Sequence, residues 1–158
     1  SYQIVLSGLN IMTKIGIFVG TVYGNALAVA EEAQRILLEH NHQANVYEEG
    51  TLADWEKYST VLVITSSTGQ GDLPDTIAPL FYELRDNVGY QPNLSYGLIA
   101  LGDSSYDYFC GAGMQFDELL QEHQAKRIGE ILKIDGMEVA EPEVFAIDWL
   151  ENWVSLLN

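Results

Sequence analysis

The sequence predicts an α/β fold in which helices cover both faces of a doubly wound, five-stranded parallel sheet. Two observations carry this prediction. Apolar runs of strand length alternate five times with segments of helical periodicity, a pattern typical of parallel strands joined by right-handed crossovers. The run at residues 59–65 is apolar on both of its faces, as expected for a strand in the middle of a parallel sheet. A ligand site in such a fold lies at the carboxyl ends of the strands.

The first half of the chain supplies three strands. Residues 15–19 form an apolar run that predicts a buried strand. The amphipathic segment 25–39 is predicted to be a helix, with small apolar residues on one face and charged residues on the other. A short strand at residues 44–47 and one helical turn at residues 52–55 lead to the central strand. Trp55, beside that turn, is expected to pack in the core.

The second half continues the alternation. A helix is predicted at residues 75–86, a strand at 96–101 and a helix that ends near residue 123. The fifth strand is predicted at residues 126–134 and the last helix at 145–156. The apolar residues of this last helix have helical spacing and predict core packing rather than a cofactor contact: Trp149, Leu150, Trp153, Val154 and Leu157.

The chain is predicted to be one domain. Its 158 residues, 47% of them hydrophobic, are enough for one well-packed core, and no linker or repeat interrupts residues 12–158. Residues 1–11 precede a natural start at Met12 and are interpreted as a vector-derived remnant or a mobile N-terminal arm, with an edge strand as the alternative. One cysteine, no signal peptide and no apolar run of about 20 residues predict a soluble protein of the reducing cytoplasm.

The charge balance excludes two classes of partner. Seven Lys and Arg residues against 23 Asp and Glu residues give a net charge of −16. Such a polyanion repels nucleic acid and anionic lipid, so neither is expected as a partner. A basic protein partner becomes attractive, although the acidity could serve solubility alone.

The loop at residues 21–26 joins the first strand to the first long helix. Backbone N–H groups and the positive end of the helix dipole favour an anion there, and Thr21 and Asn25 add polar side chains. The loop has neither the spacing of a Walker motif nor that of a dinucleotide fold, and no Lys or Arg lies between Lys14 and Arg35. These features predict a site for one phosphate held by neutral donors. The alternative is an ordinary turn in which Asn25 caps the helix.

Two further loops leave carboxyl ends of strands and can meet the first around one ligand. Residues 66–72 supply small hydroxyls and two glycines, which let the backbone approach a flat ring and change its peptide orientation. Residues 101–110 supply N–H groups beside Tyr106, Tyr108 and Phe109. Together the three loops predict a site for a nucleotide with a flat heteroaromatic head.

The sequence resembles the flavodoxins over residues 14–157. The runs that carry the resemblance are Thr21-Val22-Tyr23-Gly24-Asn25-Ala26 and Gly102-Asp103-Ser104-Ser105-Tyr106-Asp107-Tyr108-Phe109-Cys110-Gly111-Ala112. The FMN domains of diflavin reductases carry a similar run, but no reductase domain follows Asn158, so a short, free-standing flavodoxin is expected. The resemblance implies a flavodoxin-like sheet with strand order 2-1-3-4-5 and FMN as the cofactor.

The resemblance also implies which residues bind FMN. They are Thr21, Val22, Tyr23, Gly24, Asn25, Ala26, Ser66, Ser67, Thr68, Gly69, Gln70, Leu101, Gly102, Asp103, Tyr106, Tyr108, Phe109 and Cys110. The first six would hold the phosphate, and Tyr106 would stack on the isoalloxazine. The Gly69 carbonyl would turn toward flavin N5 on reduction, whereas Tyr108 and Phe109 would shape their loop from behind. The pyrimidine edge of the flavin would be contacted by backbone groups of Leu101, Gly102, Asp103 and Cys110.

Two departures from the family pattern are expected to matter. Ala26 stands where many flavodoxins have Thr, which removes one phosphate hydrogen bond and about 1.5–3 kcal/mol of binding if nothing replaces it. Thr68 stands where many have an aromatic residue, so one face of the flavin should be less covered. Both changes predict looser FMN binding.

The resemblance implies a monomeric, non-enzymatic carrier that moves single electrons between a reductase and acceptor proteins. Asp72, Asp75, Asp103 and Asp107 would disfavour the fully reduced anion and make the carrier a strong reductant. Glu83, Asp117 and Glu118 would steer a basic redox partner into a transient complex.

Other functions fit the sequence less well. An FMN-dependent quinone or NAD(P)H oxidoreductase could use the flavin face that Thr68 leaves open. A phospho-receiver domain fails because its acidic positions hold Gly20-Thr21 and Thr65-Ser66. A metal site is not expected, because His40 and His42 lack companion ligands and are interpreted as solvated turn residues.

Overall fold

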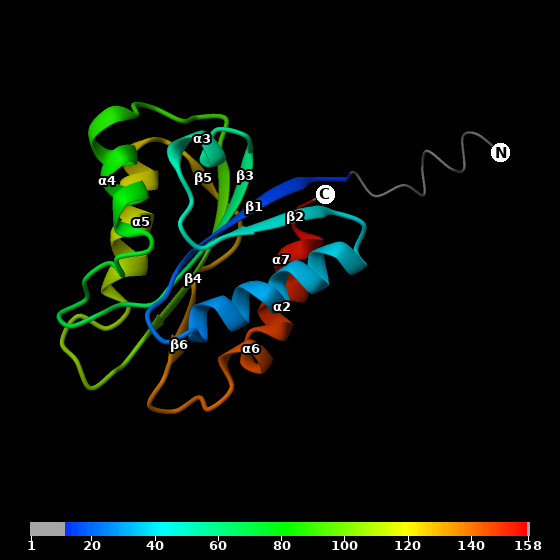
Figure 1. Ribbon diagram of the computed structural model, residues 1–158. Coiled ribbons are helices and arrows are strands. Elements are labelled where there is room, and N and C mark those ends of the chain that lie inside the picture. Colours follow the sequence, from blue (N-terminus) through cyan, green and yellow to red (C-terminus); the bar gives the residue numbers. More distant parts are fainter. Residues whose placement is uncertain (1–11, 158) are drawn as a thin grey trace, which may run out of the picture.

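The computed structural model describes residues 12–157 (Figure 1). The predicted N-terminal arm, residues 1–11, therefore lies outside the described residues. The strands are β1 (Lys14–Gly20), β2 (Gln43–Tyr47), β3 (Thr60–Thr65), β4 (Ser95–Gly102), β5 (Lys126–Arg127) and β6 (Leu132–Asp135). The helices are α2 (Asn25–Glu39), α3 (Leu52–Trp55), α4 (Ala78–Asn87), α5 (Gly111–Glu122), α6 (Pro142–Phe145) and α7 (Ile147–Ser155).

The sheet is parallel, with the strand order β2-β1-β3-β4-β5, and β6 also pairs with β4. In the register of the central strands, Ile17 of β1 lies between Val46 of β2 and Leu62 of β3. Every residue of β3 is buried, as its apolar sequence predicts. The α/β class, the doubly wound topology and the predicted strand order are confirmed.

Helices cover both faces of the sheet (Figure 1). On one face, α2 and α7 bury Ala30, Leu37 and Trp153 against β1, β3 and β4. On the other face, α4 and α5 bury residues such as Phe81 and Phe116 against β3 and β4, and Trp55 of α3 belongs to the same core. The prediction that Trp55 and Trp153 pack in the core is confirmed, because both are almost fully buried.

The fifth strand is not continuous, so the prediction of one strand over residues 126–134 is wrong. β5 and β6 are separated by a segment in which Gly129 has a φ of 75°, a value that an extended strand does not contain. Indole groups from α7 bind the carbonyls of this break: Trp153 Nε1 donates to Ile128 O and Trp149 Nε1 donates to Glu130 O, each at 3.0 Å. The left-handed backbone at Gly129 and these tertiary hydrogen bonds both lie at the break. The helix predicted at residues 145–156 corresponds to α7, and the short helix α6 precedes it.

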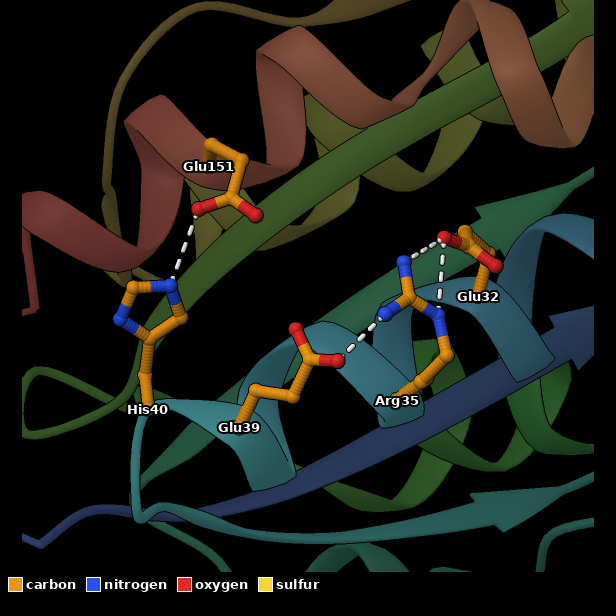
Figure 2. A network of polar contacts seen from close by, with 5 residues as sticks. All are labelled: Glu32, Arg35, Glu39, His40 and Glu151. Atoms are coloured by element: carbon orange, nitrogen blue, oxygen red, sulfur yellow. Dashed lines mark hydrogen bonds and ion pairs between the residues drawn. The ribbon is translucent and has the colours of Figure 1, made fainter.

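Polar contacts tie the end of α2 to α7 (Figure 2). His40 Nε2 lies 2.9 Å from Glu151 Oε2, while Arg35 pairs with Glu32 and Glu39 on the outer face of α2. These pairs are exposed to solvent, which screens their charges, so they contribute little to the stability of the fold.

The interpretation of His42 as a solvated turn residue is wrong, whereas His40 does lie in the turn after α2 and is partly exposed. His40 makes the contact with Glu151, and His42 is buried, where its Nδ1 accepts a hydrogen bond from Thr13 N–H at 2.9 Å. Burial lowers the pKa of His42. Among residues 12–157, no group of three or more His, Cys, Asp or Glu side chains is arranged to hold a metal ion. None of the helices described is long and apolar enough to cross a bilayer.

Candidate cofactor site

A cavity of about 680 Å³ opens at the carboxyl ends of the central strands. This volume lies in the range of about 300–1,000 Å³ that is usual for small-molecule sites. Its lining brings together thirteen of the eighteen predicted site residues: Val22, Tyr23, Asn25, Ser66, Ser67, Thr68, Gly69, Leu101, Gly102, Asp103, Tyr106, Tyr108 and Cys110. The five predicted residues outside the lining are Thr21, Gly24, Ala26, Gln70 and Phe109.

The loop after β1 is held from behind by Thr76. Thr21 N–H donates to Thr76 Oγ1 at 3.0 Å, and the same hydroxyl donates to Thr21 O at 3.3 Å. Thr21 Oγ1 in turn accepts a hydrogen bond from Gly24 N–H at 2.9 Å. Thr21 therefore orders the loop from outside the cavity.

Other donors of this loop face no protein partner. Within residues 12–157, the N–H groups of Val22, Tyr23, Asn25 and Ala26 have no hydrogen-bond acceptor. They lie at the N-terminus of α2, where the helix dipole favours an anion. This end of the cavity suits a phosphate group.

The capping role considered for Asn25 is not observed. Gly24 is the N-cap residue, with a φ of 91° and no side-chain cap, while Asn25 is exposed and lines the cavity. Ala26 is fully buried in the core beside Val29, so it can offer only its backbone N–H to a ligand.

The loop after β3 is a tight turn. Thr68 N–H donates to Asp72 O at 2.9 Å, and Asp72 N–H donates to Thr68 O at 2.7 Å. Gly69, at the exposed tip, has a φ of 47°, and a Cβ there would meet only Asp72 Oδ2 at 3.5 Å. The peptide at the tip has room to change its orientation.

This turn is fixed against the loop after β4 and the start of α5. Gly71 has a φ of 86°, and a Cβ at this position would lie 2.7 Å from Tyr108 Cβ. Ala112 N–H donates to Ser67 Oγ, and Gln115 Nε2 donates to Gly71 O, both at 3.0 Å. The two loops consequently hold one another in place.

The loop after β4 presents two tyrosines. Asp103 Oδ1 accepts hydrogen bonds from Ser105 N–H at 2.8 Å and Ser105 Oγ at 2.5 Å, which closes the start of the loop. Tyr106 and Tyr108 line the cavity and are 53% and 63% exposed. The expectation that Tyr108 lies behind the loop is therefore wrong, whereas Phe109 is partly buried outside the lining.

Cys110 closes this loop from the core side. It has a φ of 58° and is fully buried, and its Sγ donates to Ala100 O at 3.3 Å. Burial raises the pKa of the Cys110 thiol to about 11, so it stays neutral at physiological pH. A Cβ at Gly102 would lie 2.7 Å from Cys110 N, so only glycine permits this approach of the two backbones.

A fourth wall of the cavity was missed by the sequence reasoning. It begins in β6 with Ile134 and continues after this strand with Gly136, Val139, Ala140 and Pro142. Gly71 also lines the cavity and was not among the predicted residues. The rule that ligands bind at the carboxyl ends of parallel strands would have pointed to this segment, had it been applied to the fifth strand.

One of the acidic residues expected to steer a partner is already used within the protein. Asp117 accepts a hydrogen bond from the Tyr96 hydroxyl at 2.6 Å and pairs with Arg127 Nη1 at 3.0 Å, and its side chain is only 14% exposed. Burial and the bond to Asp117 raise the pKa of Tyr96. Arg127 therefore offsets the charge of Asp117, and the steering role expected for Asp117 stays a prediction. Of the other acidic residues expected near the site, only Asp103 is partly buried. The exposed ones are Asp72, Asp75, Glu83, Asp107 and Glu118.

The geometry accommodates a group with one phosphate at the α2 end and a flat ring between the loops after β3 and β4. Unpartnered N–H groups supply the phosphate end, and glycine backbone and tyrosine side chains supply the ring end. The residues present therefore fit a flavin mononucleotide.

Comparison with known proteins agrees with this geometry. The flavodoxin family model matches residues 17–148. The chain is 58% identical to flavodoxin YqcA of Escherichia coli K12, over 93% of this chain and 100% of the relative, and 35% identical to Protein MioC of the same organism, over 93% and 100%. The solved structure of a cysteine-to-serine mutant of flavodoxin from Pseudomonas aeruginosa superposes with a TM-score of 0.86 at 37% identity, covering 91% of this chain and 98% of that one. The chain thus belongs to the flavodoxin family, whose cofactor is FMN.

Proposed function

We propose that this protein carries single electrons between a reductase and acceptor proteins and turns over no substrate of its own. FMN supplies the one-electron redox chemistry when it is bound. The observation that carries the proposal is the cavity itself, in which neutral phosphate donors and a ring site share one opening. The family to which the chain belongs supports this role.

The chain would hold the phosphate without a cation. The free N–H groups of residues 22–26 and the exposed Asn25 amide are the proposed donors. No Lys or Arg is among the residues that line the cavity, so the helix dipole and neutral donors would stabilise the phosphate charge.

At the ring end, Tyr106 is the proposed stacking residue, and the backbone of residues 101–103 is the proposed partner of the pyrimidine edge. Tyr108 also lines the cavity, so it is a second aromatic residue available to the ring. Gly69 has the open surroundings that a rotating carbonyl needs, which supports its proposed role at flavin N5.

The proposed partner is a basic redox protein that binds transiently to the monomeric carrier. Exposed carboxylates at Asp72, Asp75 and Asp107 belong to the loops around the cavity or follow them directly, and the net charge is −16. Tyr23, which is 93% exposed at the cavity, adds an apolar contact. Charge steering predicts that reduction by a basic reductase slows as ionic strength rises. A rate independent of salt would contradict this part of the proposal.

We also place the carrier in the cytoplasm. Cys110 is the only cysteine, and its buried neutral thiol needs no oxidising compartment.

A reductive titration of the FMN-loaded protein tests the proposed function. A one-electron carrier should take up its two electrons in separate steps, with a paramagnetic stage between them. Absence of FMN binding, or reduction in a single two-electron step, would contradict the proposal. Rapid oxidation of NAD(P)H by the protein alone would favour the oxidoreductase instead.

A further inference from the structure

Asp135 links two walls of the cavity although it does not line the cavity itself. It is the last residue of β6 and lies opposite Gly102 of β4 in the sheet register. Its Oδ1 accepts two backbone hydrogen bonds, from Ser104 N–H at 3.1 Å and from Met137 N–H at 3.0 Å. One carboxylate oxygen therefore joins two segments that are far apart in the sequence.

The first of these segments carries the ring-binding loop. Ser104 sits between Asp103, which lines the cavity, and Tyr106, the proposed stacking residue. Tyr106 N–H donates to Asp103 O at 3.1 Å, so the loop is a closed turn whose outer N–H group, that of Ser104, is held by Asp135.

The second segment is the wall at residues 136–142. Asp135 O accepts hydrogen bonds from Glu138 N–H at 3.0 Å and Val139 N–H at 2.9 Å, which folds this wall into a turn. Gly136 N–H donates to Gly102 O at 2.8 Å, which joins the wall to the end of β4. Main chain and side chain of Asp135 thus organise the same wall.

We propose that Asp135 is a positioning residue for FMN. Its carboxylate holds the loop at residues 103–106 and the wall at residues 136–142 at a fixed separation. The inference rests on the placement of FMN proposed above. The hydrogen bonds from Ser104 and Met137 lower the pKa of Asp135, so the carboxylate is ionised and accepts strongly at neutral pH. Because Asp135 is only partly buried, its replacement leaves the core intact.

Two substitutions separate geometry from charge. Asp135→Ala removes the acceptor, whereas Asp135→Asn keeps an oxygen at the same position and removes only the charge. Glu138→Ala is the matched control, because Glu138 is an exposed acidic residue of the same wall. Fluorescence titration of each apoprotein with FMN gives Kd, and thermal unfolding of each apoprotein reports its stability.

We expect Asp135→Ala to raise the Kd for FMN by about 10- to 100-fold, Asp135→Asn to raise it by less because it keeps a neutral oxygen acceptor, and Glu138→Ala to stay within about threefold of the wild type. Asp135→Ala should also lower the unfolding temperature of the apoprotein, because both hydrogen bonds to Asp135 form without FMN, whereas Glu138→Ala should leave that temperature unchanged. A Kd for Asp135→Ala within about threefold of the wild type, or equal losses for Ala and Asn, would overturn the positioning role. If the wild type itself bound no FMN, the proposed placement of the cofactor would be refuted. If every variant bound FMN as the wild type does, only the positioning role of Asp135 would be refuted.

Amide hydrogen exchange in the FMN-loaded wild type provides a test that needs no substitution. The N–H groups of Ser104 and Met137 should both exchange slowly, since each is held by Asp135. Exchange at the rate of an unprotected loop amide at either position would overturn the inference even if the Ala variant did not fold.

Discussion

Replacement of Gly71 by Ala tests how the loops after β3 and β4 fit together. Gly71 has a φ of 86°, which costs an alanine about 1–2 kcal/mol. The new Cβ would also lie 2.7 Å from Tyr108 Cβ, which is a steric clash, and 3.0 Å from Tyr108 O, which is a tight contact. Overpacking of this kind adds about 1–3 kcal/mol, so Gly71→Ala should destabilise the protein by about 2–5 kcal/mol.

Gly24 provides a matched control, because its φ of 91° is almost the same and a Cβ there would meet no atom within 4 Å. Gly24→Ala should therefore cost only the backbone strain of about 1–2 kcal/mol. Urea unfolding of both apoproteins measures the difference, which should move the midpoint by about 1 M at an m value of about 1–3 kcal/mol/M. Equal destabilisation by the two substitutions would refute the close contact between Gly71 and Tyr108.

Three further predictions concern single side chains. Trp153→Phe removes the indole donor to Ile128 O and should lower the free energy of unfolding by about 1–3 kcal/mol in urea experiments. Thr21→Val should raise the Kd for FMN by about tenfold in a fluorescence titration, whereas Thr21→Ser, which keeps the loop-ordering hydroxyl, should bind within about threefold of the wild type. Burial lowers the pKa of His123, so the unfolded chain takes up this proton first as the pH falls below about 6.5, and stability is lost. Because glutamine does not titrate, His123→Gln should lose less stability than the wild type between about pH 7.5 and about pH 5.5 in the same unfolding assay.

The tautomer of His123 follows from a neighbour that can only donate. Trp55 Nε1 donates to Gln91 Oε1 at 2.9 Å, which places Gln91 Nε2, a donor, toward His123 Nδ1. Nδ1 must accept, so the neutral ring carries its proton on Nε2. Protonation would set two donors against each other, which agrees with the direction of the pKa shift.

Local chemistry allowed much of the site to be predicted from the sequence. The loops at residues 21–26, 66–72 and 101–110 each combine an apolar strand with glycine and small polar residues, so their positions at strand ends follow from nearby residues alone. Thirteen of the predicted residues do line one cavity. Prediction of the strand order also needed the resemblance to a known family, because the alternation of strands and helices alone does not decide which strands are neighbours.

What could not be predicted depends on distant residues. The break after Arg127 is completed by indoles of α7, which lie well beyond the segment that they shape. The ion pair of Asp117 could not be predicted, because its partner Arg127 comes from β5 and is brought beside α5 by the fold. Tyr108 lines the cavity in a loop that packs closely against Gly71 of another loop, a contact that nearby sequence does not reveal.

The broken strand beside β4 also bears on how the protein behaves in a crowded solution. A long, straight edge strand offers unpaired N–H and C=O groups to a second chain and favours edge-to-edge pairing. Here that edge is reduced to two residues of β5 and four of β6, with the Ile128 and Glu130 carbonyls between them occupied by tryptophan indoles. Loss of an indole would free a carbonyl at this edge, so we expect substitution of Trp149 or Trp153 to favour edge-to-edge association as well as to weaken packing.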